Sequence, residues 1–243
     1  MSTMKNWLAQ SSPALKARFA GILYLFTGMA FVFADSFVRG KLVVADNAAA
    51  TAHNILAHET LYRMGFAADL ISAVGFIAVT LLFFDIFKPV NKSIALLAAF
   101  FSLAGCTIQA FICFLHLAAL VILGGVQYLS AMKLEQLQDL ALLSLNLHAQ
   151  ANCIYMVFFG MYNILLGCLI LRSRFLPRII GIFMIIAGLT YQAFLFPPLA
   201  QSLFPFLIGP AGALGELSLV FWLILFGVNS QRWNEQASAA NTI

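Results

Sequence analysis

Apolar residues dominate this chain in six long runs, and short polar stretches separate the runs. The runs cover about residues 18–38, 59–87, 93–124, 140–171, 178–196 and 211–228. A transmembrane α-helix needs roughly 20 apolar residues, and each run is close to this length or longer. Lipid offers no hydrogen-bond partners, so each run must satisfy its own backbone as a helix. The pattern therefore predicts an all-α membrane bundle of six transmembrane helices.

The distribution of basic residues predicts the orientation of this bundle. Six spans place both ends of the chain on the same side of the membrane. Of the thirteen lysines and arginines, nine lie near the membrane on the side of the N-terminus. Lys and Arg are enriched in cytoplasmic loops, so both termini are predicted to be cytoplasmic. The chain then divides into a cytoplasmic leader, a membrane domain and a cytoplasmic tail, at residues 1–16, 17–229 and 230–243.

Two segments on the outer side have their own predicted structure. Between the first two runs, Asp46 or Asn47 is placed to cap a short helix over residues 48–57, because either side chain accepts from free backbone N–H groups. This helix is too short and too polar to cross a membrane. Prolines end the fifth run, and the uncharged residues 197–210 are predicted to form a loop that lies against the headgroups or folds back over the bundle.

Composition agrees with this class of protein. Hydrophobic residues make up 63% of the chain and charged residues 9%, whereas soluble domains carry about 25% charged residues. The net charge of +4 comes from short loops beside apolar runs, so it does not indicate nucleic-acid binding. The four cysteines form no Cys-x-x-Cys pair and indicate no disulfide framework. Membrane lipids are the partners that this composition predicts.

A few polar side chains interrupt the apolar runs. A charged side chain at the centre of a transmembrane helix costs about 2.5–3.5 kcal/mol, so such residues usually face the bundle interior and serve a function. His116 and His148 each lie 23 residues from the inner end of their run, which puts them at one height on neighbouring helices. Gln109 shares a helix face with His116, and Asn152 shares one with His148. We expect these two polar faces to point at each other.

Other runs contribute acidic and amide side chains at similar depth. Asp35 and Asp69 lie near the height of the histidines, and Gln192 and Glu216 lie slightly deeper. Arg63 is the guanidinium that we expect to reach this level. The sequence therefore predicts a polar pocket in the outer half of the bundle, with the candidate residues Asp35, Arg63, Asp69, Gln109, His116, His148, Asn152, Gln192 and Glu216.

Acidic groups outnumber fixed cations in this predicted pocket. Either some of the acids are protonated or a cation is present. A divalent metal held by His116, His148, Asp69 and Glu216 is one solution, because imidazole and carboxylate are common metal ligands. One alternative is that the histidines form hydrogen bonds that hold helices together. A proton or ion path is the other.

Three further residues, His53, His58 and Glu59, lie at the predicted mouth of the pocket. The two histidines are five positions apart, which points them about 140° apart around a helix, so they cannot bind one metal from one helix face. Glu59 precedes Arg63 by four positions, the order that favours a helical ion pair. Arg63 is therefore either the partner of Glu59 or a group that binds the carboxylate or phosphate of a ligand.

Several sequence motifs carry a family resemblance. They are Arg18-Phe-Ala-Gly-Ile-Leu-Tyr24, Phe37-Val-Arg39-Gly40, Ala48-Ala-Ala-Thr-Ala-His-Asn-Ile55, Arg63-Met-Gly-Phe-Ala-Ala-Asp69 and Asn146-Leu-His148. Together they resemble a bacterial integral-membrane family known as domain of unknown function 4386. The resemblance covers nearly the whole chain and implies a multi-pass protein of the bacterial inner (cytoplasmic) membrane. It also implies that Asp69 and His148 belong to shared motifs, and it implies no activity.

These observations lead to one main functional hypothesis. The pocket is predicted to bind or process a small amphipathic or lipid-like molecule, with or without a metal. The alternatives are a proton-coupled transporter and a sensor or assembly subunit whose polar groups only hold helices together. The lack of an internal repeat opposes the transporter. No nucleophile elbow and no phosphate loop is present in the sequence, so no catalytic residue is predicted.

Overall fold

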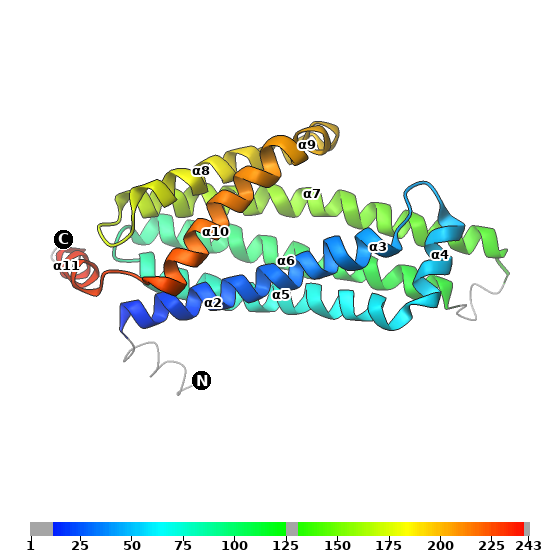
Figure 1. Ribbon diagram of the computed structural model, residues 1–243, viewed down its shortest axis with the longest axis horizontal. Coiled ribbons are helices and arrows are strands. Elements are labelled where there is room, and N and C mark those ends of the chain that lie inside the picture. Colours follow the sequence, from blue (N-terminus) through cyan, green and yellow to red (C-terminus); the bar gives the residue numbers. More distant parts are fainter. Residues whose placement is uncertain (1–11, 125–130, 241–243) are drawn as a thin grey trace. The chain divides into compact units, whose positions relative to one another are not determined.

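The computed structural model describes residues 12–124 and 131–240 of the chain (Figure 1). These residues form helices and turns, with no β-strand among them. Six of the described helices are long and apolar enough to cross a membrane. The predicted all-α fold with six spans is therefore confirmed, and the chain is a multi-pass membrane protein. The cytoplasmic position of the termini stays a prediction.

The first span is longer than its apolar run predicted. Helix α2 (Pro13–Val32) continues through a π-helical turn, η1 (Phe33–Arg39), into α3 (Gly40–Leu42). The whole span covers Pro13–Leu42, whereas the sequence predicted residues 18–38. Most of the predicted leader lies outside the described residues. The next two spans, α5 (Glu59–Phe87) and α6 (Lys92–Leu123), agree closely with the prediction, whereas the fourth, α7 (Leu134–Arg172), begins six residues before the predicted residue 140.

The segment that was predicted as an outer loop is helical. The fifth span consists of α8 (Arg178–Tyr191) and the short turn η3 (Gln192–Leu195), and the sixth consists of α9 (Pro197–Leu203), the π-helical turn η4 (Phe204–Ile208) and α10 (Gly209–Leu225). The loop prediction was wrong because prolines at the start of a helix replace N–H groups that have no partner there. Pro197 and Pro198 occupy the first two positions of α9, and Pro205 and Pro210 occupy the second positions of η4 and α10.

Packing divides the chain into two compact units. Unit 1 contains residues 1–25, 75–105 and 156–243, and unit 2 contains residues 26–74 and 106–155.

Unit 2 contains the short outer helix. Helix α4 (Ala48–Ala57) begins where the sequence predicted, and the side chain of Asn47 accepts a hydrogen bond from the backbone N–H of Ala50 at 2.9 Å. Asn47, rather than Asp46, is therefore the cap. Apolar side chains from the first span and from α4, α5, α6 and α7 form the core of this unit: Val38, Leu42, Ile55, Tyr62, Ala119, Leu120, Ala141 and Leu145.

Unit 1 is held together by close helix contacts at glycines. Helix α8 packs against α10 (Figure 1) and also against α7. A Cβ atom built on Gly188 would lie 2.5 Å from the carbonyl oxygen of Gly160 and 2.8 Å from the backbone nitrogen of Ile164. Small residues allow such close backbone approach in membrane bundles. The described part of the tail forms α11 (Ser230–Ala240) and belongs to this unit.

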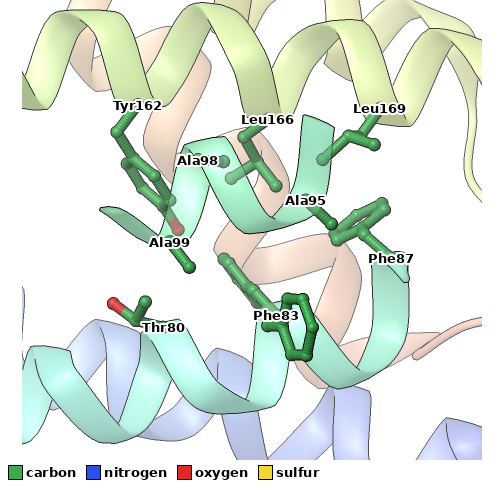
Figure 2. Close-up of a pocket in the computed structure, with 10 residues that line it drawn as sticks. Thr80, Phe83, Phe87, Ala95, Ala98, Ala99, Tyr162, Leu166 and Leu169 are labelled. Atoms are coloured by element: carbon green, nitrogen blue, oxygen red, sulfur yellow. The ribbon is translucent and has the colours of Figure 1, made fainter. Parts of the chain in front are cut away.

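An apolar cavity lies inside unit 1 (Figure 2). Phe83, Phe87, Tyr162 and Leu166 form much of its lining, and the space left for a water-sized sphere is about 10 Å³. None of its lining residues is acidic, basic or a histidine. It therefore offers no charge that would bind a polar ligand.

Candidate functional site

An ion pair between Arg39 and Asp69 lies at the centre of the polar cluster in unit 2. Both terminal nitrogens of Arg39 donate to the carboxylate of Asp69, Nη1 to one oxygen and Nη2 to the other at 3.4 Å. Only 9% of the arginine side chain and 4% of the aspartate side chain are exposed. Removing two charges from water costs several kcal/mol for each, so each depends on the other for compensation.

A π-helical turn places Arg39 at this position. The N–H of Gly40 bonds to the carbonyl of Asp35, five residues earlier, which is the hydrogen-bond pattern of a π-helix. Nη2 of Arg39 also donates to Asp35 Oδ1 at 3.2 Å, and the Asp35 side chain is 46% exposed. Arg39 thus joins a buried carboxylate on α5 to a partly exposed carboxylate on its own helix.

Tyr62 fixes the orientation of His116. The two rings stack with their centroids 4.0 Å apart, and the tyrosine hydroxyl donates to the backbone carbonyl of His116 at 2.7 Å. Nε2 of His116 lies 3.0 Å from the carbonyl oxygen of Tyr62. A carbonyl only accepts, so this nitrogen carries a proton. Nδ1 is then free to accept, and it lies 3.4 Å from Nη1 of Arg39.

The two histidines that were predicted at equal depth lie side by side. The ring centroids of His116 and His148 are 6.1 Å apart in an edge-to-face arrangement. Asp69, His116 and His148 each offer one atom that can bind a metal, and these three atoms lie within 4.8 Å of one another. This spacing resembles a metal site. However, the guanidinium of Arg39 contacts Asp69 and His116, so it already supplies the positive charge that the predicted metal was to supply.

A small cavity adjoins this cluster. The space for a water-sized sphere is about 10 Å³, roughly what one buried water requires. Two of the lining residues, Arg39 and Gln109, have buried N–H groups (Nε and Nε2) with no acceptor in the part of the chain that the structure describes. The complete lining consists of Phe31, Arg39, Asp69, Gln109, Ile112, Cys113, His148 and Asn152.

Two residues of the cavity lining reach the surface of unit 2. Phe31 and Asn152 are partly exposed, whereas the other lining side chains are buried. Phe31 is on α2, and its ring packs 6.0 Å from that of Tyr155, which is on α7 with Asn152. The partly exposed part of the lining therefore lies where these two helices meet.

The residues predicted at the mouth lie elsewhere on unit 2. Nε of Arg63 donates to Glu59 at 2.7 Å, and the two side chains are 59% and 47% exposed. This is the ion pair that their spacing indicates. His53 and His58 are also exposed. None of these four residues lines the cavity, and their place at a pocket mouth stays a prediction.

Two predicted pocket residues belong to unit 1 instead. A carboxylate oxygen of Glu216 accepts from the hydroxyl of Tyr191 at 2.6 Å. Nε2 of Gln192 donates to the carbonyl of Gly188 at 3.1 Å. Among the described residues, the group with metal-like spacing does not include Glu216. The predicted four-ligand site is therefore reduced to three residues.

Sequence reasoning did not find Arg39. The first apolar run was expected to end at Val38, which placed Arg39 in an outer segment. One signal in the sequence indicates otherwise. Asp35 and Arg39 are four positions apart, the spacing of a helical ion pair, and this spacing favours a helix that continues past the apolar run.

Comparison with known proteins decides the family. The model of the family described as Domain of unknown function (DUF4386) matches residues 19–227. The chain belongs to this family. The region matched by DUF4386 contains Arg39, Asp69, His116 and His148 together with the whole lining of the adjoining cavity. No curated protein and no solved structure was found to match the chain. The DUF4386 description states no activity, so the functional argument depends on the site itself.

Proposed function

We propose that unit 2 binds the polar head of a small amphipathic molecule that carries an uncharged hydrogen-bond acceptor, such as a carbonyl group. The observation that supports this most directly is the pair of buried donors, Arg39 Nε and Gln109 Nε2, beside one cavity. A buried donor without an acceptor costs about 1–3 kcal/mol. A ligand oxygen that reaches both groups would recover part of this cost on binding.

Local charge favours an uncharged ligand. Arg39 contributes one positive charge, and its partners Asp35 and Asp69 contribute two negative charges. An anionic head would therefore meet a net negative cluster, and the low dielectric of the membrane domain strengthens that repulsion. A carbonyl or hydroxyl oxygen accepts hydrogen bonds without this cost.

The size of the cavity determines how such a molecule enters. The cavity takes roughly one water, so a single ligand oxygen would replace that water. The apolar part of the molecule would remain outside, beside Phe31 at the α2–α7 seam. We infer that the ring of Phe31 rotates to admit the head, because its neighbour Tyr155 is the more buried of the two. His148 and Asn152, one turn apart on α7, would contact the entering group.

Gln109→Leu is expected to weaken ligand binding about fivefold to tenfold while keeping or slightly raising the melting temperature. The variant removes one hydrogen bond to the ligand and one unpaired buried donor from the free protein. The probe is a medium-chain fatty-acid methyl ester that carries a diazirine, cross-linked to the purified protein in nanodiscs. Mass spectrometry then maps the labelled peptides and measures their yield.

Two controls make this experiment decisive. A diazirine alkane of matched length lacks the carbonyl, and it should label Phe31 and Asn152 peptides much less than the ester does. Gln192→Leu removes an amide from unit 1 and should leave the ester labelling unchanged. Equal labelling by ester and alkane, or ester labelling that is as strong in Gln109→Leu as in the parent protein, would contradict the proposal.

A proton-coupled carrier is the second candidate. This candidate is supported by a carboxylate oxygen of Asp69 and ring nitrogens of His116 and His148, which lie within 4.8 Å of one another on membrane-spanning helices. Such groups are typical of proton relays. If this candidate is correct, Asp69→Asn should abolish proton flux in liposomes that contain the protein, because an amide cannot exchange a proton with His116 or His148. Flux that is equal in the variant and the parent protein, or absent in both, would exclude it.

A further inference from the structure

A second, larger polar cavity opens on the surface of unit 1 and is lined by three exposed arginines. It forms where α7 ends, α8 begins and α11 passes, and its volume is about 360 Å³. Small-molecule sites in proteins commonly have volumes of roughly 300–1,000 Å³. The lining residues are Ser173, Arg174, Leu176, Arg178, Arg232 and Glu235. We call this space the arginine cavity.

The arginine cavity carries uncompensated positive charge. Its lining contains three guanidinium groups and one carboxylate. Among the described residues, none of the three arginines forms a salt bridge. Glu235 accepts a hydrogen bond from the amide of Gln231 at 3.1 Å. The lining therefore has a net charge of about +2, which favours an anionic ligand.

Hydrogen bonds hold α11 in place at this cavity. Trp233 Nε1 donates to the carbonyl of Ile86 at 2.8 Å, which fixes α11 to the end of α5. Nη1 of Arg232 donates to the carbonyl of Arg174 at 3.4 Å. The side chain of Gln236 accepts from the backbone N–H of Arg174 at 3.1 Å. The arginines from distant parts of the chain are thus brought together before any ligand binds.

The start of α8 adds further positive potential. Arg178, which lines the cavity, is the first residue of α8, and no side chain caps this helix end. The first turn also contains no acidic residue. The free N–H groups and the helix dipole at such an end attract anions, and phosphate in particular.

The position of the arginine cavity relative to the membrane narrows the choice of anion. Helices α7 and α8 both contribute to spans, and the cavity lies at the ends of these spans. Its level is therefore that of lipid headgroups. Basic pockets between transmembrane helices typically bind anionic headgroups on the cytoplasmic side, and the distribution of lysine and arginine predicts this side to be cytoplasmic.

We propose that the arginine cavity binds a phosphate group, carried either by an anionic phospholipid or by a soluble phosphate ester. Arg174 and Arg232 are the residues that contact the phosphate from two sides, and Arg178 adds charge from the start of α8. Glu235 opposes binding through like-charge repulsion. This site belongs to unit 1 and does not depend on the function proposed for unit 2.

The test uses the full-length protein, purified and delipidated in detergent. It is titrated with phosphatidylglycerol, with phosphatidylcholine and with glycerol 3-phosphate, and native mass spectrometry measures the bound fraction. Phosphatidylglycerol is expected to bind more tightly than the zwitterionic lipid. Arg174→Gln and Arg232→Gln are each expected to weaken this binding about fivefold, since one basic residue near a lipid surface contributes about 1 kcal/mol. Glu235→Gln should strengthen it by a similar factor.

The controls separate a specific site from a general charge effect. Arg63→Gln removes an exposed arginine from unit 2 and should leave binding unchanged, and Arg232→Lys should retain most of the affinity because it keeps the charge. Melting temperatures identify variants that fail to fold. Binding of glycerol 3-phosphate as well as the lipid would assign the site to soluble esters too, whereas lipid binding alone would assign it to the membrane. The proposal would be overturned if Arg63→Gln and Arg232→Gln weakened phosphatidylglycerol binding equally, or if Glu235→Gln weakened it.

Discussion

Arg39→Met is expected to lower the free energy of unfolding in detergent micelles by about 3–5 kcal/mol. The variant leaves the carboxylate of Asp69 buried without its partner, and breaking a buried ion pair from one side typically has a cost of this size. The side chain of Asp69 is only 4% exposed, so water cannot replace the guanidinium without opening the helices. Denaturant-induced unfolding, followed by circular dichroism or tryptophan fluorescence, measures the change.

A double variant distinguishes the ion pair from simple packing. Arg39→Met with Asp69→Leu removes both charges, and apolar replacement of a buried ion pair often leaves the stability unchanged. We therefore expect the double variant to be much more stable than Arg39→Met alone. Arg63→Met is the matched control, because its exposed pair with Glu59 is worth about 1 kcal/mol or less. An equal loss in Arg39→Met and Arg63→Met would show that Arg39 is not the buried partner described above.

Gly188→Leu is the second substitution with a large expected effect. A side chain at this position would collide with the backbone of α7, since even a Cβ would lie 2.5 Å from the Gly160 carbonyl. Overpacking costs about 1–3 kcal/mol and occasionally more. A cost at the upper end of this range is expected here, because the new side chain would collide with backbone atoms, which cannot rotate away. Thermal unfolding in detergent should show the loss, with Gly188→Ala intermediate between the parent protein and the leucine variant.

Gly28→Leu is the control for this substitution. No atom lies within 4 Å of a Cβ built on Gly28, so the new side chain meets open space. Leucine also favours a helix more than glycine does. Gly28→Leu should therefore be as stable as the parent protein or slightly more stable. If Gly188→Leu behaves in the same way, α7 and α8 do not approach each other as closely as described.

The six spans were predictable from the sequence because, in lipid, the need to satisfy the backbone hydrogen bonds outweighs other influences on local structure. A long apolar run must be helical when no water can satisfy its backbone, so hydropathy alone locates each span. The ends were less predictable, because they depend on local hydrogen bonds. The residues between Val38 and Leu42, and those from Pro197 to Pro210, continue their helices through π-helical turns. The number of apolar residues in a run does not indicate where such turns occur.

The candidate site was predictable in part for a related reason. Counting residues from the end of a span gives the height of a side chain, and this placed His116 beside His148. The same count says nothing about direction around the bundle. Glu216 was therefore grouped with the histidines, although its carboxylate bonds to Tyr191 in unit 1. Arg39 was missed because its main partner, Asp69, is 30 positions away and only folding joins them.

The bond between Arg39 and Asp35 has a consequence during membrane insertion. The first span precedes α5 along the chain, so Arg39 enters the bilayer before α5 brings Asp69 beside it. During this interval, Asp35 is the nearby carboxylate on the same helix, four residues away. An intrahelical counter-ion lowers the cost of holding a guanidinium in lipid. We therefore expect Asp35 to compensate the charge of Arg39 until Asp69 arrives, and in the folded protein Arg39 contacts both carboxylates.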